Sequence, residues 1–286
     1  MLIQNWADRS TAMAQPTPKL RAITISQSFI QSLPTLPRVV GLAPLAHISG
    51  QEALDADPPK LWLRRTIQPY VNLANTALTD PNVHRECTEN CTPSIERTFM
   101  VSAEGDVVRA AALYFLYPAN VALTAMYPDV EIHCQAESSS GGTRPDIIYK
   151  RRGQVFAMVE YKNLGVVHQS EFTEARLPIT ASREEIEKKV KAAQCLTGQT
   201  CFGSNAIKVL KQMTAYVNNP QWNAANLKYV AMFNWDLLFL SVFGCDADVI
   251  LGTLVSRAGP ERNQLRKAYL GWLLVACNNA GGSGSG

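Results

Sequence analysis

Two short apolar runs that meet at Gly153 constrain the fold more than any other part of this 286-residue sequence. Residues 146–150 and 155–162 are rich in β-branched and aromatic side chains, and a glycine between two such runs is typical of a β-hairpin. We therefore predict an antiparallel strand pair centred on Gly153, in which Asp146 lies opposite Glu160. Opposed side chains on one face are about 5 Å apart at Cβ, and Lys162 follows on the same face about 7 Å along the strand.

Apolar side chains occupy both faces of the predicted hairpin. The face of Asp146 and Glu160 also carries Ile148, Phe156 and Met158; the other face carries Ile147, Tyr149, Val155, Ala157, Val159 and Tyr161. Strands that are apolar on both faces are covered on both sides, so the two carboxylates would repel each other in a desolvated place. A divalent cation removes both penalties, which makes Asp146 and Glu160 candidate ligands for Mg²⁺, with Mn²⁺ as a substitute. Lys162 is a candidate for holding or deprotonating a water, or for stabilising negative charge.

The remaining patterns predict an α/β fold with a mixed central sheet and helices on both faces. Helices are expected over 103–117, with Ser102 as N-cap and an end before Pro118, and over 183–194, 205–217 and 262–277. Further strands are expected over 130–137, 229–233 and 237–243.

Three regions are expected along the chain. Residues 1–95 form an N-terminal extension that is rich in proline and partly irregular, with short helices near 24–33 and 61–78. Residues 96–280 form the main domain and end in the C-terminal helix. Residues 281–286 are typical of an engineered linker and are left out of the fold prediction.

Pro145-Asp146 followed by Glu160-Tyr161-Lys162 resembles the bipartite signature of the PD-(D/E)xK nuclease superfamily. The resemblance covers roughly residues 96–243 and implies a restriction-endonuclease-like αβββαβ core. It also implies that Asp146 and Glu160 bind the metal and that Lys162 serves the attacking water.

Two additions to the site follow from the same resemblance. The family often adds an acid from the first core helix, and Glu104 is the best match, with Asp106 or Glu96 as substitutes. RecB-type members carry a Gln-x-x-x-Tyr pattern, which Gln212 and Tyr216 fit on one helix face. A narrower similarity is to fungal proteins, including Crinkler-type effectors.

Each of these residues has a plainer interpretation. The hairpin is alternatively an exposed ribbon with a Glu–Lys salt bridge. Gln212 and Tyr216 are alternatively ordinary amphipathic positions, and Glu104 an acid that complements its helix dipole.

Six basic residues near the signature are candidates for binding a nucleic-acid backbone. They are Arg144, Lys150, Arg151, Arg152, Lys208 and Lys211. Phosphate contacts of this kind position a nucleic acid without reading its sequence. The alternative is that these side chains are simply solvated.

Composition and missing motifs exclude several classes of protein. Hydrophobic residues make up 47% of the chain and the net charge is +3, which excludes a disordered or polycationic chain. No nucleotide-binding glycine loop and no serine-hydrolase elbow is present. His84, Cys87 and Cys91 lack a fourth zinc ligand nearby, so no zinc site is expected.

The chain carries no signal peptide that we recognise, and Asp246 and Asp248 interrupt the longest apolar stretch, 237–255. Seven cysteines suit reduced thiols. An intracellular protein of the nucleus or cytoplasm, without a membrane partner, is therefore expected.

The sequence thus predicts a Mg²⁺-dependent nuclease that hydrolyses phosphodiester bonds in DNA, in preference to RNA, by a metal-activated water. The alternative is a catalytically inactive module of the same fold that binds nucleic acid or protein. The N-terminal extension is a candidate for docking a partner or forming a homodimer.

Overall fold

A single mixed β-sheet runs through the computed structural model, which describes residues 22–36, 51–92, 101, 103–134, 144–196, 198–219, 228–244 and 246–281. Its strands are β1 (Leu61–Arg64), β2 (Val130–Cys134), β3 (Ile147–Arg151), β4 (Gln154–Tyr161), β5 (Arg176–Pro178), β6 (Tyr229–Phe233), β7 (Leu237–Phe243) and β8 (Val249–Ser256). Their order across the sheet is β2-β3-β4-β6-β7-β8-β1-β5. The predicted α/β class with a mixed sheet is confirmed.

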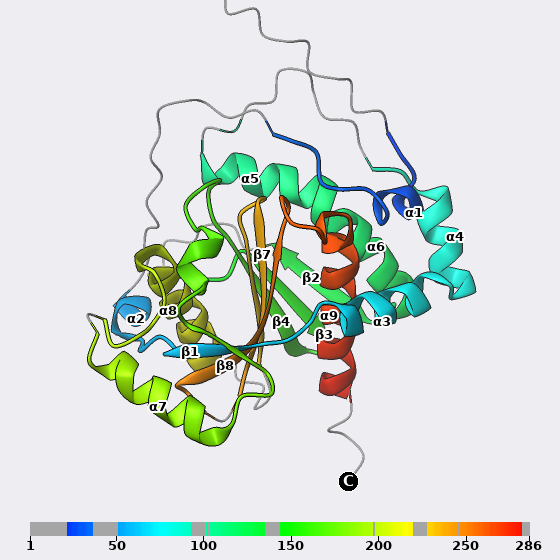
Figure 1. Ribbon diagram of the computed structural model, residues 1–286. Helices are drawn as coiled ribbons and strands as arrows, with labels where there is room; N and C mark the ends of the chain where they lie inside the picture. Colours follow the sequence, from blue (N-terminus) through cyan, green and yellow to red (C-terminus); the bar gives the residue numbers. More distant parts are fainter. Residues whose placement is uncertain are drawn as a thin grey trace, which may run out of the picture.

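Helices cover both faces of this sheet (Figure 1). They are α1 (Ile25–Ser28), α2 (Gln51–Asp55), α3 (Gln68–Leu78), α4 (Pro81–Glu89), α5 (Glu104–Ala111), α6 (Tyr117–Met126), α7 (Arg183–Gln194), α8 (Ser204–Asn218) and α9 (Leu265–Gly281). A π-helical turn, η1 (Ala112–Leu116), joins α5 to α6, and two 3₁₀ turns are η2 (Gln169–Phe172) and η4 (Arg262–Gln264). One face packs against α3, α5, α6 and α9, and the other packs against α8.

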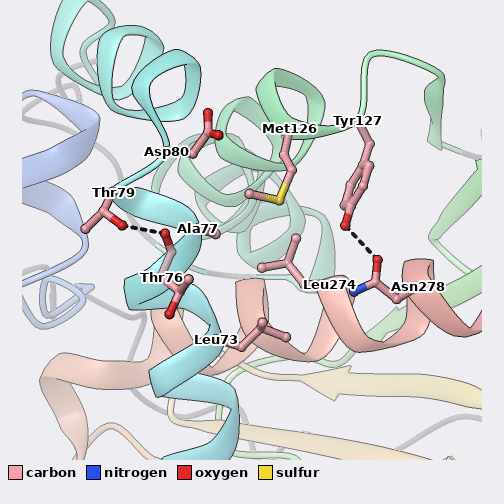
Figure 2. Close-up of a pocket in the computed structure, with 9 residues that line it drawn as sticks. All are labelled: Leu73, Thr76, Ala77, Thr79, Asp80, Met126, Tyr127, Leu274 and Asn278. Carbon is pink, nitrogen blue, oxygen red and sulfur yellow. Dashed lines mark hydrogen bonds between the residues drawn. The ribbon is translucent and has the colours of Figure 1, made fainter.

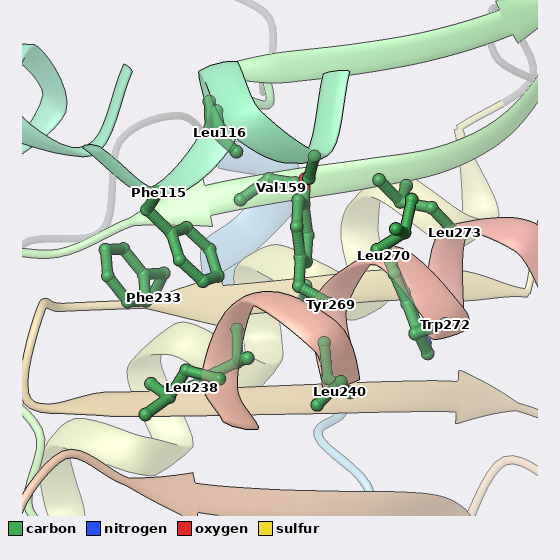
Figure 3. Close-up of a cluster of buried hydrophobic side chains, with 14 of the residues drawn as sticks. Phe115, Leu116, Val159, Phe233, Leu238, Leu240, Tyr269, Leu270, Trp272 and Leu273 are labelled. Carbon is green, nitrogen blue, oxygen red and sulfur yellow. The ribbon is translucent and has the colours of Figure 1, made fainter. Parts of the chain in front are cut away.

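The larger core lies between the sheet and α9. Phe115 stacks on Phe233 with ring centroids 4.2 Å apart, and Tyr269 lies against the same Phe115 ring (Figure 3). Val159 and Leu240 reach this cluster from β4 and β7. The smaller core on the opposite face takes Ile148, Met158 and the apolar side of α8. The hairpin is therefore covered on both sides, as its sequence predicts.

The register of the β3–β4 hairpin agrees with the prediction beside the signature but not at the turn. Ile147 pairs with Val159 and Tyr149 with Ala157, as a centre at Gly153 requires. Beyond a bulge the register shifts by one residue, so that Arg151 pairs with Gln154 around the turn Arg152-Gly153. The bulge reverses the facing of two side chains: Phe156 joins the larger core and Val155 the smaller one. The predicted faces of Phe156 and Val155 were therefore wrong.

A parallel connection follows the hairpin. β4 leads through α8 to β6, which pairs with β4 in parallel, while β2, β3 and β4 are antiparallel. The order helix, three strands, helix, strand is thus present, with β5 and α7 inserted before α8. The helix over 183–194 and the strands over 229–233 and 237–243 are confirmed; helix 205–217 is one residue longer at each end.

The segment before residue 95 contributes a strand to the sheet. Leu61–Arg64 is β1, which lies between β8 and β5, and the helix expected over 61–78 is shorter, Gln68–Leu78. β1, β5 and β8 were not predicted. The described part of residues 1–95 therefore shares the sheet and core of the main domain, while 1–21, 37–50 and 93–95 lie outside the described residues.

Pro118 does not end the first long helix, contrary to the prediction. α5, η1 and α6 run on from Glu104 to Met126, with Pro118 in the first turn of α6. Because proline has no N–H, the carbonyl of Tyr114 four residues earlier needs another donor. The Nε of Arg266 provides it at 2.6 Å. The predicted N-cap, Ser102, lies outside the described residues.

That same helix is the one described segment long and apolar enough to cross a bilayer by length and composition. In the protein 56% of its most apolar window is buried, as in a core helix. The apolar stretch over 237–255 is instead divided between β7 and β8. At the other end of the chain, Gly281 belongs to α9 rather than to the predicted linker.

Candidate functional site

The residues of the predicted signature meet where β3 begins and β4 ends. Asp146 directly precedes β3, and its Oδ2 accepts the backbone N–H of Tyr161 at 2.7 Å. Glu160 is the second-last residue of β4, and Lys162 directly follows the strand. The backbone N–H of Lys162 donates to the carbonyl of Phe233 at the end of β6, 3.0 Å away. Contacts between the ends of β3, β4 and β6 therefore fix the positions of the three residues.

Glu160 and Lys162 form a buried ion pair. Lys162 Nζ lies 2.5 Å from Glu160 Oε1, and each side chain is only 5% exposed. A buried charge is costly unless it is paired and hydrogen-bonded. The exposed salt bridge considered as the plain alternative is therefore not what the structure contains.

Helix α8 supplies the second partner of Glu160. The Tyr216 hydroxyl lies 2.6 Å from Glu160 Oε2 and 3.0 Å from the carbonyl of Arg144. Gln212 is one helical turn earlier and only 1% exposed. Within the described part of the chain its Oε1 has no hydrogen-bond partner. The Gln-x-x-x-Tyr pattern thus reaches the site through Tyr216 and leaves a buried acceptor at Gln212.

Glu104 lies at the rim of the site rather than among its ligands. Its Oε2 accepts the backbone N–H of Asn163 at 3.1 Å and is 4.0 Å from Lys162 Nζ. Among the described residues no three acidic, imidazole or thiol side chains are grouped for one metal ion. The predicted ligand set of Glu104, Asp146 and Glu160 is therefore not assembled in this arrangement. Asp106 caps α5 through the N–H of Ala103, and Glu96 lies outside the described residues.

The charges of the site perturb one another strongly. Burial, and then the neighbouring Glu160, raise the pKa of Asp146 to about 8. Burial tends to lower the pKa of Lys162, but Glu160 and Glu104 outweigh it and the pKa is raised. The pKa of Tyr216 is raised well above its usual value by burial and by Glu160. Lys162 is therefore a firmly held cation.

The donor set suits a hard divalent cation. Mg²⁺ is usually held by one or two carboxylates, with water and substrate phosphate completing its shell. Asp146 and Glu160 are two such carboxylates whose mutual repulsion a cation would relieve. Gln212 is on the same helix face as Tyr216, and its buried Oε1 lacks a hydrogen-bond partner among the described residues.

The structure separates most of the predicted basic contacts from this site. Arg151 and Arg152 are at the turn of the hairpin, where both pair with Asp129. The four residue steps from Ile147 to Arg151 span about 13 Å of strand, so the turn, with Lys150 beside it, is at the opposite end from Asp146. Lys211 donates to the carbonyl of Leu54, and Lys208 lies about 12 Å of helix before Tyr216. Arg144, whose carbonyl contacts Tyr216, is beside the site.

Two asparagines belong to the site region but were not predicted. Asn163 binds Glu104 through its N–H, and fully buried Asn234 donates to the carbonyl of Val167 in the loop after Lys162. Because Asn163 directly follows the signature, its position in the sequence could have indicated that it belongs to the site. Asn234 is remote in sequence, and no sequence pattern indicated its place beside the loop after Lys162.

A hollow of about 270 Å³ lies away from this site, between α3, α6 and α9, and none of the predicted site residues lines it (Figure 2). Its floor includes Leu73, Ala77 and Leu274, and at its rim Tyr127 donates to Asn278.

Nearby α4 holds Cys87, whose thiol pKa is raised to about 11 by burial. His168 is exposed and begins η2.

Comparison with known proteins gives no relative for this arrangement. No protein-family model matches the chain, and no significant match was found among curated proteins or among solved structures.

Proposed function

We propose that this protein is a metal-dependent nuclease that hydrolyses phosphodiester bonds, with DNA as its preferred substrate over RNA. One observation carries the proposal: four polar side chains from three separate elements converge in one cluster, in which Glu160, Lys162 and Tyr216 are buried and Asp146 is half-buried. A cluster of buried ionisable groups with perturbed pKa values is typical of active sites.

The residues would divide the work as follows. Asp146 and Glu160 would hold Mg²⁺, or Mn²⁺ in its place, which when bound lowers the pKa of a water and neutralises phosphate charge. Lys162, held as a cation, positions the water by donating a hydrogen bond and stabilises the negative charge that develops on phosphorus oxygens. Tyr216 orients the Glu160 carboxylate, and Gln212 offers its open acceptor.

The connectivity supports membership of the PD-(D/E)xK superfamily. In this assignment α5–α6, β2, β3, β4, α8 and β6 form the αβββαβ core, and β4 and β6 are joined by the helix that carries Tyr216. A RecB-type member, similar to fungal Crinkler-type effectors, is the narrower form of this proposal. Of the basic residues, Arg144 is the best placed to meet a substrate phosphate.

Cleavage assays with isosteric variants test the proposal. Plasmid, linear DNA and RNA are incubated with the protein and Mg²⁺ or Mn²⁺, beside Asp146→Asn, Lys162→Met and the control Asp129→Asn. We expect wild type and Asp129→Asn to cleave, and a loss of at least 100-fold in the two site variants, because each removes a charge from the reacting centre. Cleavage that survives both site substitutions would refute the assignment.

The alternative function is a non-catalytic binding module. It is favoured by the complete engagement of Glu160, whose two oxygens are held by Lys162 and Tyr216. Calorimetric titration with Mn²⁺ separates the two functions. Saturable binding that Asp146→Asn abolishes supports the nuclease, and absence of binding supports the module.

A further inference from the structure

We infer that the N-terminal strap, which we define as residues 22–36, is a positioning element for the loop that follows Lys162. The connection runs through the β6–β7 turn, Asn234–Asp236, which contacts the strap on one side and the loop on the other. This inference rests on the proposed function only for its effect on catalysis.

The end of β6 and the turn that follows it hold both ends of the loop. Phe233 accepts the N–H of Lys162 at 3.0 Å, and the next residue, Asn234, donates its Nδ2 to the carbonyl of Val167 at 2.7 Å. The same amide accepts the N–H of Leu237 at 2.8 Å, which closes the turn. Asn234 is completely buried, so each of these bonds is made without competition from water.

The turn itself is strained and needs support. Trp235 has φ of +71°, a left-handed conformation that is unfavourable for a bulky residue, and it is completely buried. Such a residue keeps its conformation only where its surroundings fix it. Here its indole Nε1 donates to the carbonyl of Pro34 in the strap at 2.9 Å.

A second contact joins the strap to the same turn. Arg257 donates through Nε to Asp236 at 2.8 Å and through Nη1 to the Thr35 hydroxyl at 3.4 Å. The strap is anchored independently, because Arg266 Nη1 binds the carbonyls of Ser28 and Gln31 at 2.7 and 2.9 Å. A fixed strap therefore holds a strained turn. This turn and the adjoining end of β6 in turn hold the backbone of Lys162 and the loop that follows it.

Hydrogen exchange measured by mass spectrometry on the full chain tests this connection without using catalysis. Asn234→Asp breaks the contact with the loop, and Trp235→Phe keeps a ring but loses the bond to Pro34. Ser241→Ala is the matched control, because it removes another buried bond onto β6, from Ser241 Oγ to the carbonyl of Val230. We expect amides of residues 163–168 to exchange about fivefold to tenfold faster in the first two variants and at the wild-type rate in the control.

Unchanged exchange of 163–168 in Trp235→Phe, or equal acceleration in Ser241→Ala, would overturn the inference. If Trp235→Phe does not fold, Arg257→Gln takes its place, because Arg257 is partly exposed and the substitution breaks its contacts with Thr35 and Asp236. Unchanged exchange of 163–168 in that variant would likewise overturn the inference. In the cleavage assay we expect kcat to fall about tenfold in Asn234→Asp with KM unchanged, because the variant misplaces Lys162 rather than the substrate. A wild type without nuclease activity would contradict the proposed function, while the exchange rates would still decide the inference.

Discussion

At the scale of single residues, Asp146 lies in an environment that opposes its negative charge. It accepts one backbone hydrogen bond, but burial and the neighbouring Glu160 oppose its ionisation and raise its pKa to about 8. A carboxylate kept in such a place costs stability unless something compensates its charge. Active-site groups commonly show this conflict between stability and function.

We predict that Asp146→Asn stabilises the protein in EDTA. Between pH 4 and 8 the folded wild type holds a proton at Asp146 that the unfolded chain has lost, so its free energy of unfolding falls as the pH rises. The amide cannot ionise and can still accept the N–H of Tyr161. Urea unfolding at pH 8.5 should give the variant an advantage of about 1–2 kcal/mol, and at pH 5 a smaller one.

Added metal supplies the control for this prediction. Saturating Mg²⁺ should stabilise wild type and not the variant, since only the carboxylate binds the ion. A variant that is less stable than wild type at pH 8.5 in EDTA would show that the Asp146 charge is compensated by groups other than a metal.

At the scale of elements, the β3–β4 hairpin shows how local chemistry sets the site. Its turn residues Arg152 and Gly153 both have positive φ, 52° and 76°, the combination that a two-residue type I′ turn needs. The turn alone would place Asp146 out of register with Glu160 by one residue. The bulge at Phe156 restores the register and brings the two carboxylates together.

We predict opposite effects for two glycine substitutions that are both free of contacts. An added Cβ meets nothing within 4 Å at Gly153 or at Gly105. Gly153→Ala should cost about 1–2 kcal/mol, because its backbone is left-handed. Gly105→Ala, in the first turn of α5, should stabilise by about 0.5 kcal/mol through helix propensity. Chemical denaturation measures both, and the same sign for the two variants would contradict the explanation.

At the scale of the whole molecule, buried Arg266 joins parts of the chain that are distant in sequence. It is 3% exposed, and it binds the carbonyls of Tyr114 in η1 and of Ser28 and Gln31 in the strap. Burial lowers its pKa to about 10, so it stays charged at neutral pH. It therefore satisfies the carbonyl that Pro118 leaves unpaired and fixes the strap on the same core.

We predict that Arg266→Met lowers the free energy of unfolding by about 2–4 kcal/mol, because three carbonyls, two of them in buried contacts, lose their donor. Arg183→Met is the matched control, since Arg183 is exposed and its ion pair within the described residues is with Glu187 on α7; its effect should stay within about 0.5 kcal/mol. Equal losses in the two variants, measured by urea unfolding, would show that the carbonyl contacts of Arg266 do not stabilise the fold.

Local patterns determined the elements that carry the site. The spacing of Gln212 and Tyr216 predicted a shared helix face, because the helix period is a property of neighbouring residues. The assumed centre at Gly153 gave the right register for Asp146 and Glu160, but only because an unpredicted bulge offsets the two-residue turn. Whether the assembled residues cleave DNA stays a prediction.

Only the tertiary structure decided which elements, distant in sequence, contact one another. It placed β1 and β8 beside strands far away in the chain, turned Glu104 toward Asn163, and moved Arg151 and Arg152 away from the site. It also brought Trp235 onto Pro34, a contact across about 200 residues. Such contacts depend on how whole elements pack, and no local pattern of residue types encodes that packing.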